Sequence, residues 1–145
     1  MTGEKIEWSY KRLLHEVELF AGVLKNKGVK KGDTVIIYMP MILESAAVML
    51  ACARVGAVHS VVFGGFAPKE LAGRIMDSKA SLIVSASCGI EPHKVIEYRS
   101  FIREALKIAD RESTNVIYVS RESYKLEGLE STETFYHDEM KLAEP

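Results

Sequence analysis

Two short stretches of this 145-residue chain combine residue types that could hold an anionic ligand. The first is Glu91-Pro92-His93-Lys94, in which the ammonium group of Lys94 could neutralise a phosphate and His93 could donate a hydrogen bond. We expect a helix over about residues 95–109, and the free N–H groups at its start would attract the same anion. The alternative is a charged loop exposed to solvent, and the residue pattern leaves both open.

The second stretch is Phe63-Gly64-Gly65-Phe66. Two glycines let a ligand approach the backbone closely, and their N–H groups could face an anion. The flanking phenyl rings could stack on a flat ring. The alternative is a tight turn that buries both rings in the core. Because the G-x-G-x-x-G spacing is missing, the stretch is not a dinucleotide-binding fingerprint.

Alternating apolar strands and helices must position these stretches. Continuous apolar runs predict strands at residues 34–38, 57–62, 82–84 and 116–119. Helical spacing predicts helices between Ser9 and Gly28, over residues 43–55, from about Pro68, and over 95–109. This order predicts an α/β fold with a parallel sheet covered by helices on both faces.

In such a sheet, ligands bind beyond the carboxyl ends of the strands, where both stretches and Met39-Pro40-Met41 are expected. Within the predicted elements, we expect His59 to be a hydrogen-bonded core histidine and Met76 to face inward. Beyond Ser120 the apolar pattern fades, so residues 121–145 are interpreted as a peripheral segment leading to a missing remainder.

Composition argues against several classes of partner. Nineteen Lys and Arg against 20 Asp and Glu give a net charge of −1, so no basic excess favours nucleic acid or an anionic membrane as main partner. Cys52 and Cys88 are too few and too far apart for a disulfide framework or a zinc site, and we expect buried free thiols. No membrane-spanning run and no targeting segment at Met1 to Lys5 are recognisable.

Five motifs in unbroken order resemble the AMP-forming acyl-CoA synthetases, in particular the short-chain branch of acetyl- and propionyl-CoA synthetases. The resemblance covers most of residues 6–119. The motifs are KGDTV at 31–35, MPM at 39–41, MLACARVGAVHS at 49–60, FGGF at 63–66 and AGRIMDS at 72–78.

The resemblance implies a two-step ligase. A short-chain carboxylate, propionate or acetate, attacks the α-phosphate of ATP to give an acyl-adenylate, and the thiol of coenzyme A then displaces AMP. ATP, coenzyme A and Mg²⁺ are the implied cofactors, and the mitochondrial matrix or the cytoplasm is the implied compartment. Residues 1–120 would be a partial N-terminal domain of the AMP-dependent synthetase type. The oligomeric state stays open.

The resemblance also implies a coenzyme A site at Glu91, Pro92, His93 and Lys94, with Phe63-Gly64-Gly65 as a nearby wall. Acetyl-CoA synthetases usually carry arginine at both ends of the four-residue segment, and the Glu-Pro opening here looks more like the propionyl type. Lysine in the last place keeps the charge but loses the bidentate geometry of arginine.

No catalytic or metal-binding residue is expected within these 145 residues. The phosphate loop, the adenine and ribose motifs, the acyl pocket and the C-terminal lysine that the resemblance implies are not found in the chain. We therefore predict that the chain alone does not form an acyl-adenylate. The alternative is a non-catalytic remnant that binds coenzyme A or a nucleotide, or pairs with a full-length synthetase.

Overall fold

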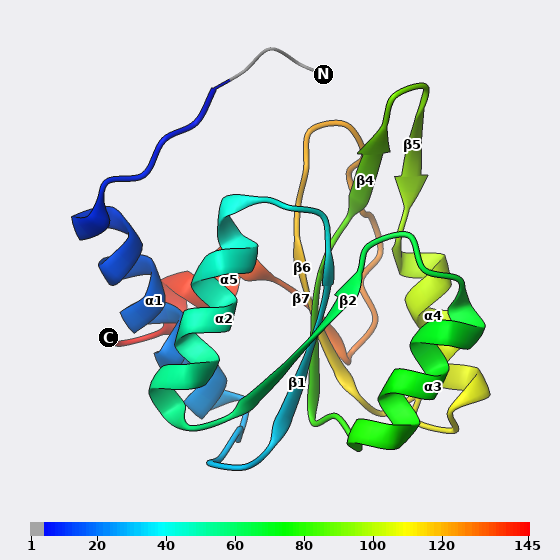
Figure 1. Cartoon of the computed structure of the whole chain (residues 1–145), viewed down its shortest axis with the longest axis horizontal. Helices are drawn as coiled ribbons and strands as arrows, with labels where there is room; N and C mark the ends of the chain where they lie inside the picture. Colours follow the sequence, from blue (N-terminus) through cyan, green and yellow to red (C-terminus); the bar gives the residue numbers. More distant parts are fainter. Residues whose placement is uncertain (1–4) are drawn as a thin grey trace.

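The apolar runs form one five-stranded sheet in the computed structural model, which describes residues 5–145 (Figure 1). Neighbouring strands are parallel throughout, in the order β2-β1-β3-β6-β7. The strands are β1 (Thr34–Met39), β2 (Val58–Phe63), β3 (Leu82–Ala86), β6 (Asn115–Val119) and β7 (Glu133–Phe135). The first four begin within one residue of the positions expected from sequence.

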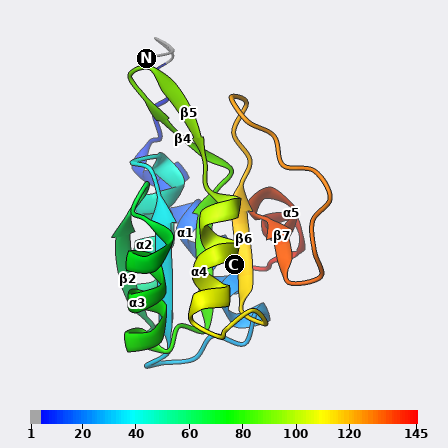
Figure 2. The ribbon, with the colours of Figure 1, turned by 90° about the vertical axis from the view of Figure 1, so that its right-hand side faces the viewer.

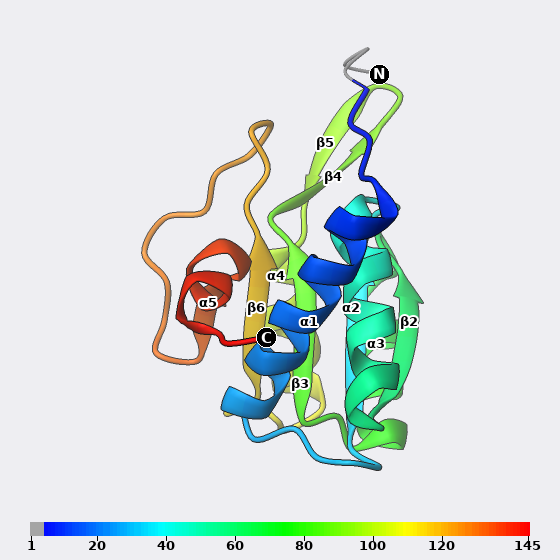
Figure 3. The same cartoon turned by 90° about the vertical axis from the view of Figure 1, so that its left-hand side faces the viewer.

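Helices cover both faces of the sheet, which confirms the predicted fold class. The helices α1 (Tyr10–Asn26), α2 (Leu43–Val55) and α5 (Tyr136–Leu142) lie on one face (Figure 3). The helices α3 (Pro68–Ser78) and α4 (Arg99–Ile108) lie on the other. The strand β1 is sandwiched between the layers, with Val35, Ile36 and Ile37 at most 1% exposed.

Local signals in the sequence set the helix ends. The Ser9 hydroxyl accepts a hydrogen bond from the N–H of Arg12 at 3.2 Å and so caps the start of α1. Gly56, with φ of +75°, adopts the left-handed conformation that ends α2 and turns the chain into β2.

The chain between β3 and α4 differs from the sequence-based expectation. Residues expected to begin a helix form an antiparallel hairpin, made of β4 (Cys88–Glu91) and β5 (Lys94–Glu97). The helix α4 begins only at Arg99, because both oxygens of the Glu97 carboxylate accept the N–H of Ser100 at 3.1 Å. Lys94 therefore lies in a strand, and its predicted place at a helix start is wrong.

Residues 121–145 also contribute more structure than expected. The strand β7 extends the sheet, with Val116 opposite Glu133 and Tyr118 opposite Phe135, and α5 follows it directly. A three-residue strand that begins with a charged residue has no apolar alternation to reveal it. The segment therefore adds an edge strand and a helix to the fold, and its interpretation as a peripheral segment stays a prediction.

Two predicted core residues are exposed. The His59 side chain is exposed, because His59 lies on β2, one of the two edge strands, which within residues 5–145 pairs with β1 alone. Met76 on α3 is 49% exposed. The two cysteines are free and buried as expected, and burial raises the pKa of the Cys52 thiol to about 12. Within residues 5–145, no helix is long and apolar enough to cross a membrane. The expectation that Met1 to Lys5 carry no targeting segment concerns residues 1–4, which lie outside the described residues.

Candidate functional site

The carboxyl ends of β1, β2 and β3 lie at one edge of the sheet, and the β4–β5 hairpin projects beyond that edge (Figure 2). The turn after β2 contains the two glycines, and the tip of the hairpin contains residues 91–94. The fold therefore brings both candidate stretches to the edge at which ligands of parallel α/β sheets bind.

Tyr38 at the end of β1 anchors the double-glycine turn. Its hydroxyl accepts a hydrogen bond from the N–H of Gly65 at 3.2 Å and donates one to the carbonyl oxygen of Phe66 at 2.8 Å. Burial raises the pKa of Tyr38 to about 12, so the hydroxyl keeps its proton at neutral pH. Since the Gly65 N–H is occupied by Tyr38, the expectation that it could face an anion is wrong.

The two phenylalanines of the turn are exposed rather than buried. Phe63 is 70% exposed and Phe66 is 39% exposed, with ring centroids 6.0 Å apart and planes tilted by 42°. The alternative in which both rings fill the core is therefore wrong. The Phe63 ring is accessible for stacking on a planar ligand.

Tyr98, just before α4, lies between the turn and the hairpin. It is only 3% exposed, and its ring centroid is 5.1 Å from that of Tyr38. A Cβ atom placed on Gly64 would lie 2.6 Å from the Tyr98 hydroxyl, and one placed on Gly89 of the hairpin would lie closer still. Burial raises the pKa of Tyr98, although the nearby Arg121 guanidinium opposes part of this effect.

The hairpin and the turn also approach each other at Glu91. A Cβ atom on Gly65 would be 4.0 Å from Oε1 of Glu91. At the hairpin tip, Glu91 on β4 lies opposite Lys94 on β5 in the strand register, and Pro92 and His93 connect the two strands. All four residues are exposed.

The predicted site residues are therefore brought together in part. Glu91 lies against the glycine turn, whereas no atom of His93 or Lys94 lies within 4 Å of a Cβ atom placed on Gly65. Among residues 5–145, no hydrogen bond or ion pair engages the His93 or Lys94 side chain. At the start of α4, the Glu97 carboxylate already occupies the N–H of Ser100.

Sequence reasoning missed Tyr38 and Tyr98. Tyr38 looks like one more apolar residue of a buried strand, and Tyr98 like one member of a helix face. The two hydrogen bonds between Tyr38 and the turn join residues that are 27 and 28 positions apart in the sequence, so no local pattern indicates them. The only hint is the presence of glycine at positions 64 and 89, where close approach of another group is one explanation.

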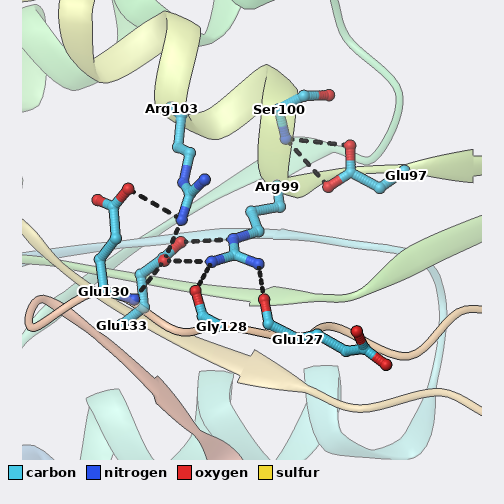
Figure 4. Close-up of polar contacts among 8 residues, drawn as sticks. All are labelled: Glu97, Arg99, Ser100, Arg103, Glu127, Gly128, Glu130 and Glu133. Carbon is cyan, nitrogen blue, oxygen red and sulfur yellow. Dashed lines mark hydrogen bonds and ion pairs between the residues drawn. The ribbon is translucent and has the colours of Figure 1, made fainter.

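A second polar cluster fastens β7 to α4 (Figure 4). Arg99 donates from Nε and Nη2 to the Glu133 carboxylate at 3.2 and 3.0 Å, and Arg103 donates to Oε1 of Glu133 at 2.6 Å. Two further Arg99 N–H groups donate to the carbonyl oxygens of Glu127 and Gly128, both at 2.6 Å. The N–H groups of Arg99 are thus occupied by partners within the protein, and we interpret the cluster as structural rather than ligand-binding.

The acidic member of this cluster has a strongly lowered pKa. Burial alone would raise the pKa of Glu133, but hydrogen bonds from Arg103, Arg99 and the N–H of Glu130 outweigh burial and lower it to about 2. No group of three or more His, Cys, Asp or Glu side chains in residues 5–145 is arranged to hold a metal ion.

Comparison with known proteins supports the resemblance seen in the sequence. The family model described as AMP-binding enzyme matches residues 1–145. Acyl-CoA synthetase short-chain family member 3 is 51% identical in mouse and 49% in human, over 121 residues that cover 83% of this chain and 18% of each relative. Acetyl-coenzyme A synthetase of Yersinia pestis (strain Pestoides F) is 47% identical over 136 residues, 93% of this chain and 21% of the relative.

The chain thus spans about a fifth of the length of these relatives. A family model that fits the full chain and relatives at about half identity lead to the same conclusion: this chain belongs to the AMP-binding enzyme family.

Proposed function

We propose that this chain forms part of a short-chain acyl-CoA synthetase, a ligase that joins propionate or acetate to coenzyme A. The observation that supports this most strongly is 47–51% identity to proteins named acyl-CoA and acetyl-CoA synthetases. In the proposed reaction, a carboxylate oxygen bonds to the α-phosphorus of ATP and pyrophosphate leaves. The sulfur of coenzyme A then bonds to the acyl carbon, and AMP leaves.

Residues 5–145 contribute to ligand binding in this proposal rather than to the bond-making steps. Mg²⁺ would offset phosphate charge in such a reaction. The described residues hold no suitable donor cluster, so we assign no metal ligand to this part of the chain. We infer that the acyl pocket and the groups that act on ATP belong to sequence that the relatives have outside the matched region.

The proposed role of the sheet edge is to hold the nucleotide end of coenzyme A. The exposed Phe63 ring would stack on the adenine, and Gly64 and Gly65 would let the nucleotide approach the backbone. The Lys94 ammonium group, which pairs with no described carboxylate, would contact a phosphate, with His93 as a further donor.

The remaining two residues of the segment would orient the ligand. Glu91 repels phosphate near Gly65 and accepts hydrogen bonds from ribose hydroxyls or the adenine amino group. Its charge would therefore direct the phosphates toward the ammonium group of Lys94, which faces Glu91 on the neighbouring strand. Pro92 fixes the backbone of the two-residue connection.

Titration with coenzyme A tests this site. We expect Lys94→Ala and Phe63→Ala each to weaken binding by about tenfold, equivalent to about 1.4 kcal/mol. Lys30→Ala is the matched control, because Lys30 is an exposed lysine before β1, at the opposite end of the sheet. Unchanged affinity in both site variants would remove this edge from the proposal.

Activity of the purified chain tests the division of labour. We expect no pyrophosphate release from ATP and propionate, and release would show that catalytic groups lie within these 145 residues. For the compartment, we propose the mitochondrial matrix or the cytoplasm, supported by the mitochondrial mouse relative and the bacterial one. Subcellular fractionation with an antibody to the chain distinguishes the two.

A further inference from the structure

Two of the three glycines at the sheet edge are not explained by their own backbone. Gly65 has φ of +100°, a conformation that favours glycine. Gly64 and Gly89 are absent from the residues with positive φ, so their backbones would accept other side chains. The hydroxyl end of Tyr98 lies closest to a Cβ atom placed on either one, and at Gly64 the backbone of Met39, at 3.0 Å, crowds the same space.

Tyr98 therefore fills the gap between two segments that are 25 residues apart. Gly64 belongs to the turn after β2, and Gly89 belongs to the first strand of the hairpin. Tyr98 is itself held in place, because its N–H donates to the carbonyl oxygen of Ser87 at 3.2 Å. Its ring also packs against that of Tyr38, whose hydroxyl forms the two hydrogen bonds to the same turn.

We propose that Tyr98 is a positioning residue that sets the separation between the Phe63–Gly65 turn and the β4–β5 hairpin, and so preorganises both walls of the coenzyme A site. The inference rests on the proposed function for its ligand, but the mechanical coupling stands on the packing alone. Phe63 lies on one wall and Lys94 on the other. A ligand that contacts both gains affinity when the walls are already at the right distance, because less motion is lost on binding.

The coupling itself is tested on the ligand-free chain by amide hydrogen exchange. Replacing the ring in Tyr98→Leu should raise exchange rates at least fivefold in both the turn and the hairpin. Tyr98→Phe, which keeps the ring, should stay within twofold of the unmodified chain. Tyr10→Ala is the control for loss of a tyrosine, since Tyr10 is 92% exposed. Faster exchange in the hairpin alone would overturn the coupling.

Binding is tested by calorimetric titration with coenzyme A. We expect Tyr98→Leu to weaken binding by at least tenfold and Tyr98→Phe by less than threefold. Phe20→Leu serves as a stability-matched control. Phe20 stacks on Tyr136 in the helix layer on the other face of the sheet from α4, so its loss should lower stability without changing affinity. A purely structural role for Tyr98 would instead give affinity losses that follow the loss of stability in both variants.

The two possible failures are distinguishable. If the unmodified chain does not bind coenzyme A, the proposed function of the edge is wrong, while the exchange experiment still decides the coupling. If it binds and Tyr98→Leu binds equally well, the positioning role is wrong. Should Tyr98→Leu fail to fold, Gly89→Ala replaces it, because the added Cβ atom on the hairpin would displace the Tyr98 ring. We expect the same changes in exchange rate and in affinity from this variant.

Discussion

The ion-pair cluster between α4 and β7 allows a quantitative prediction for Glu133→Gln. The usual pKa of 4.5 and the folded value of about 2 for Glu133 differ by an amount worth about 3 kcal/mol, at about 1.36 kcal/mol per pH unit. The Glu133 side chain is 3% exposed but that of its partner Arg103 is 41% exposed, so about 3 kcal/mol is an upper value before solvent screening. Loss of one partner from a buried ion pair costs about 3–5 kcal/mol, which is of the same size.

The sign of the pH dependence follows from the lowered pKa. Between about pH 4.5 and pH 2 the unfolded chain binds a proton at Glu133 and the folded chain does not, so acid favours unfolding. The contribution of the carboxylate is complete above pH 4.5 and is lost as the pH falls through about 2. Glutamine has no such charge, so the gap between the two proteins should narrow over this range.

Urea unfolding followed by far-UV circular dichroism measures both effects. We expect Glu133→Gln to lower the free energy of unfolding by up to about 3 kcal/mol at pH 7, and by clearly less at pH 3. Glu127→Gln is the matched control, because only the backbone carbonyl of Glu127 contacts Arg99 and its side chain is exposed. A loss below about 1 kcal/mol, or one that does not change with pH, would refute the reasoning.

Two further predictions concern the sheet edge. Lys94→Arg should tighten coenzyme A binding by about threefold, because guanidinium contacts phosphate through two parallel hydrogen bonds; weaker binding in a calorimetric titration would argue against a phosphate at this place. Gly64→Ala should cost about 1–3 kcal/mol of folding stability, because its Cβ would lie 2.6 Å from the Tyr98 hydroxyl and 3.0 Å from the carbonyl carbon of Met39. The cost should fall in the Tyr98→Phe background, and equal costs in both backgrounds, measured by urea unfolding, would contradict that contact.

The parts of the fold that sequence predicts are those with local causes. The strand β1 is a continuous apolar run because both of its faces are covered, and Ser9 and Gly56 mark helix ends through the conformation of the adjacent backbone. The position of the Phe63–Gly65 turn follows in the same way, since it directly follows an apolar strand. These elements could be read without knowledge of any distant contact.

The start of α4 and the strand β7 could not be read in this way. Apolar residues at 95, 98 and 102 continue the helical spacing of α4 backward, so periodicity hides the point at which the hairpin ends. The actual boundary depends on the Glu97 carboxylate, which caps the N–H of Ser100. The strand β7 is held by a buried ion pair with α4, which joins Arg99 to a residue 34 positions away.

The double-glycine motif shows why a site can be located from sequence while its construction cannot. Its two residues are alike in the sequence but have different tasks: Gly65 serves a left-handed turn, and Gly64 makes room for Tyr98. Only the first task is local, and so only the first can be inferred from a turn pattern. The role of Gly64 depends on packing against the hairpin, where Gly89 likewise leaves space for the Tyr98 ring. One of the two glycines that look suited to a ligand, Gly64, thus leaves room for the Tyr98 side chain. The surface that remains for the proposed ligand is formed by the exposed Phe63 ring and the hairpin tip.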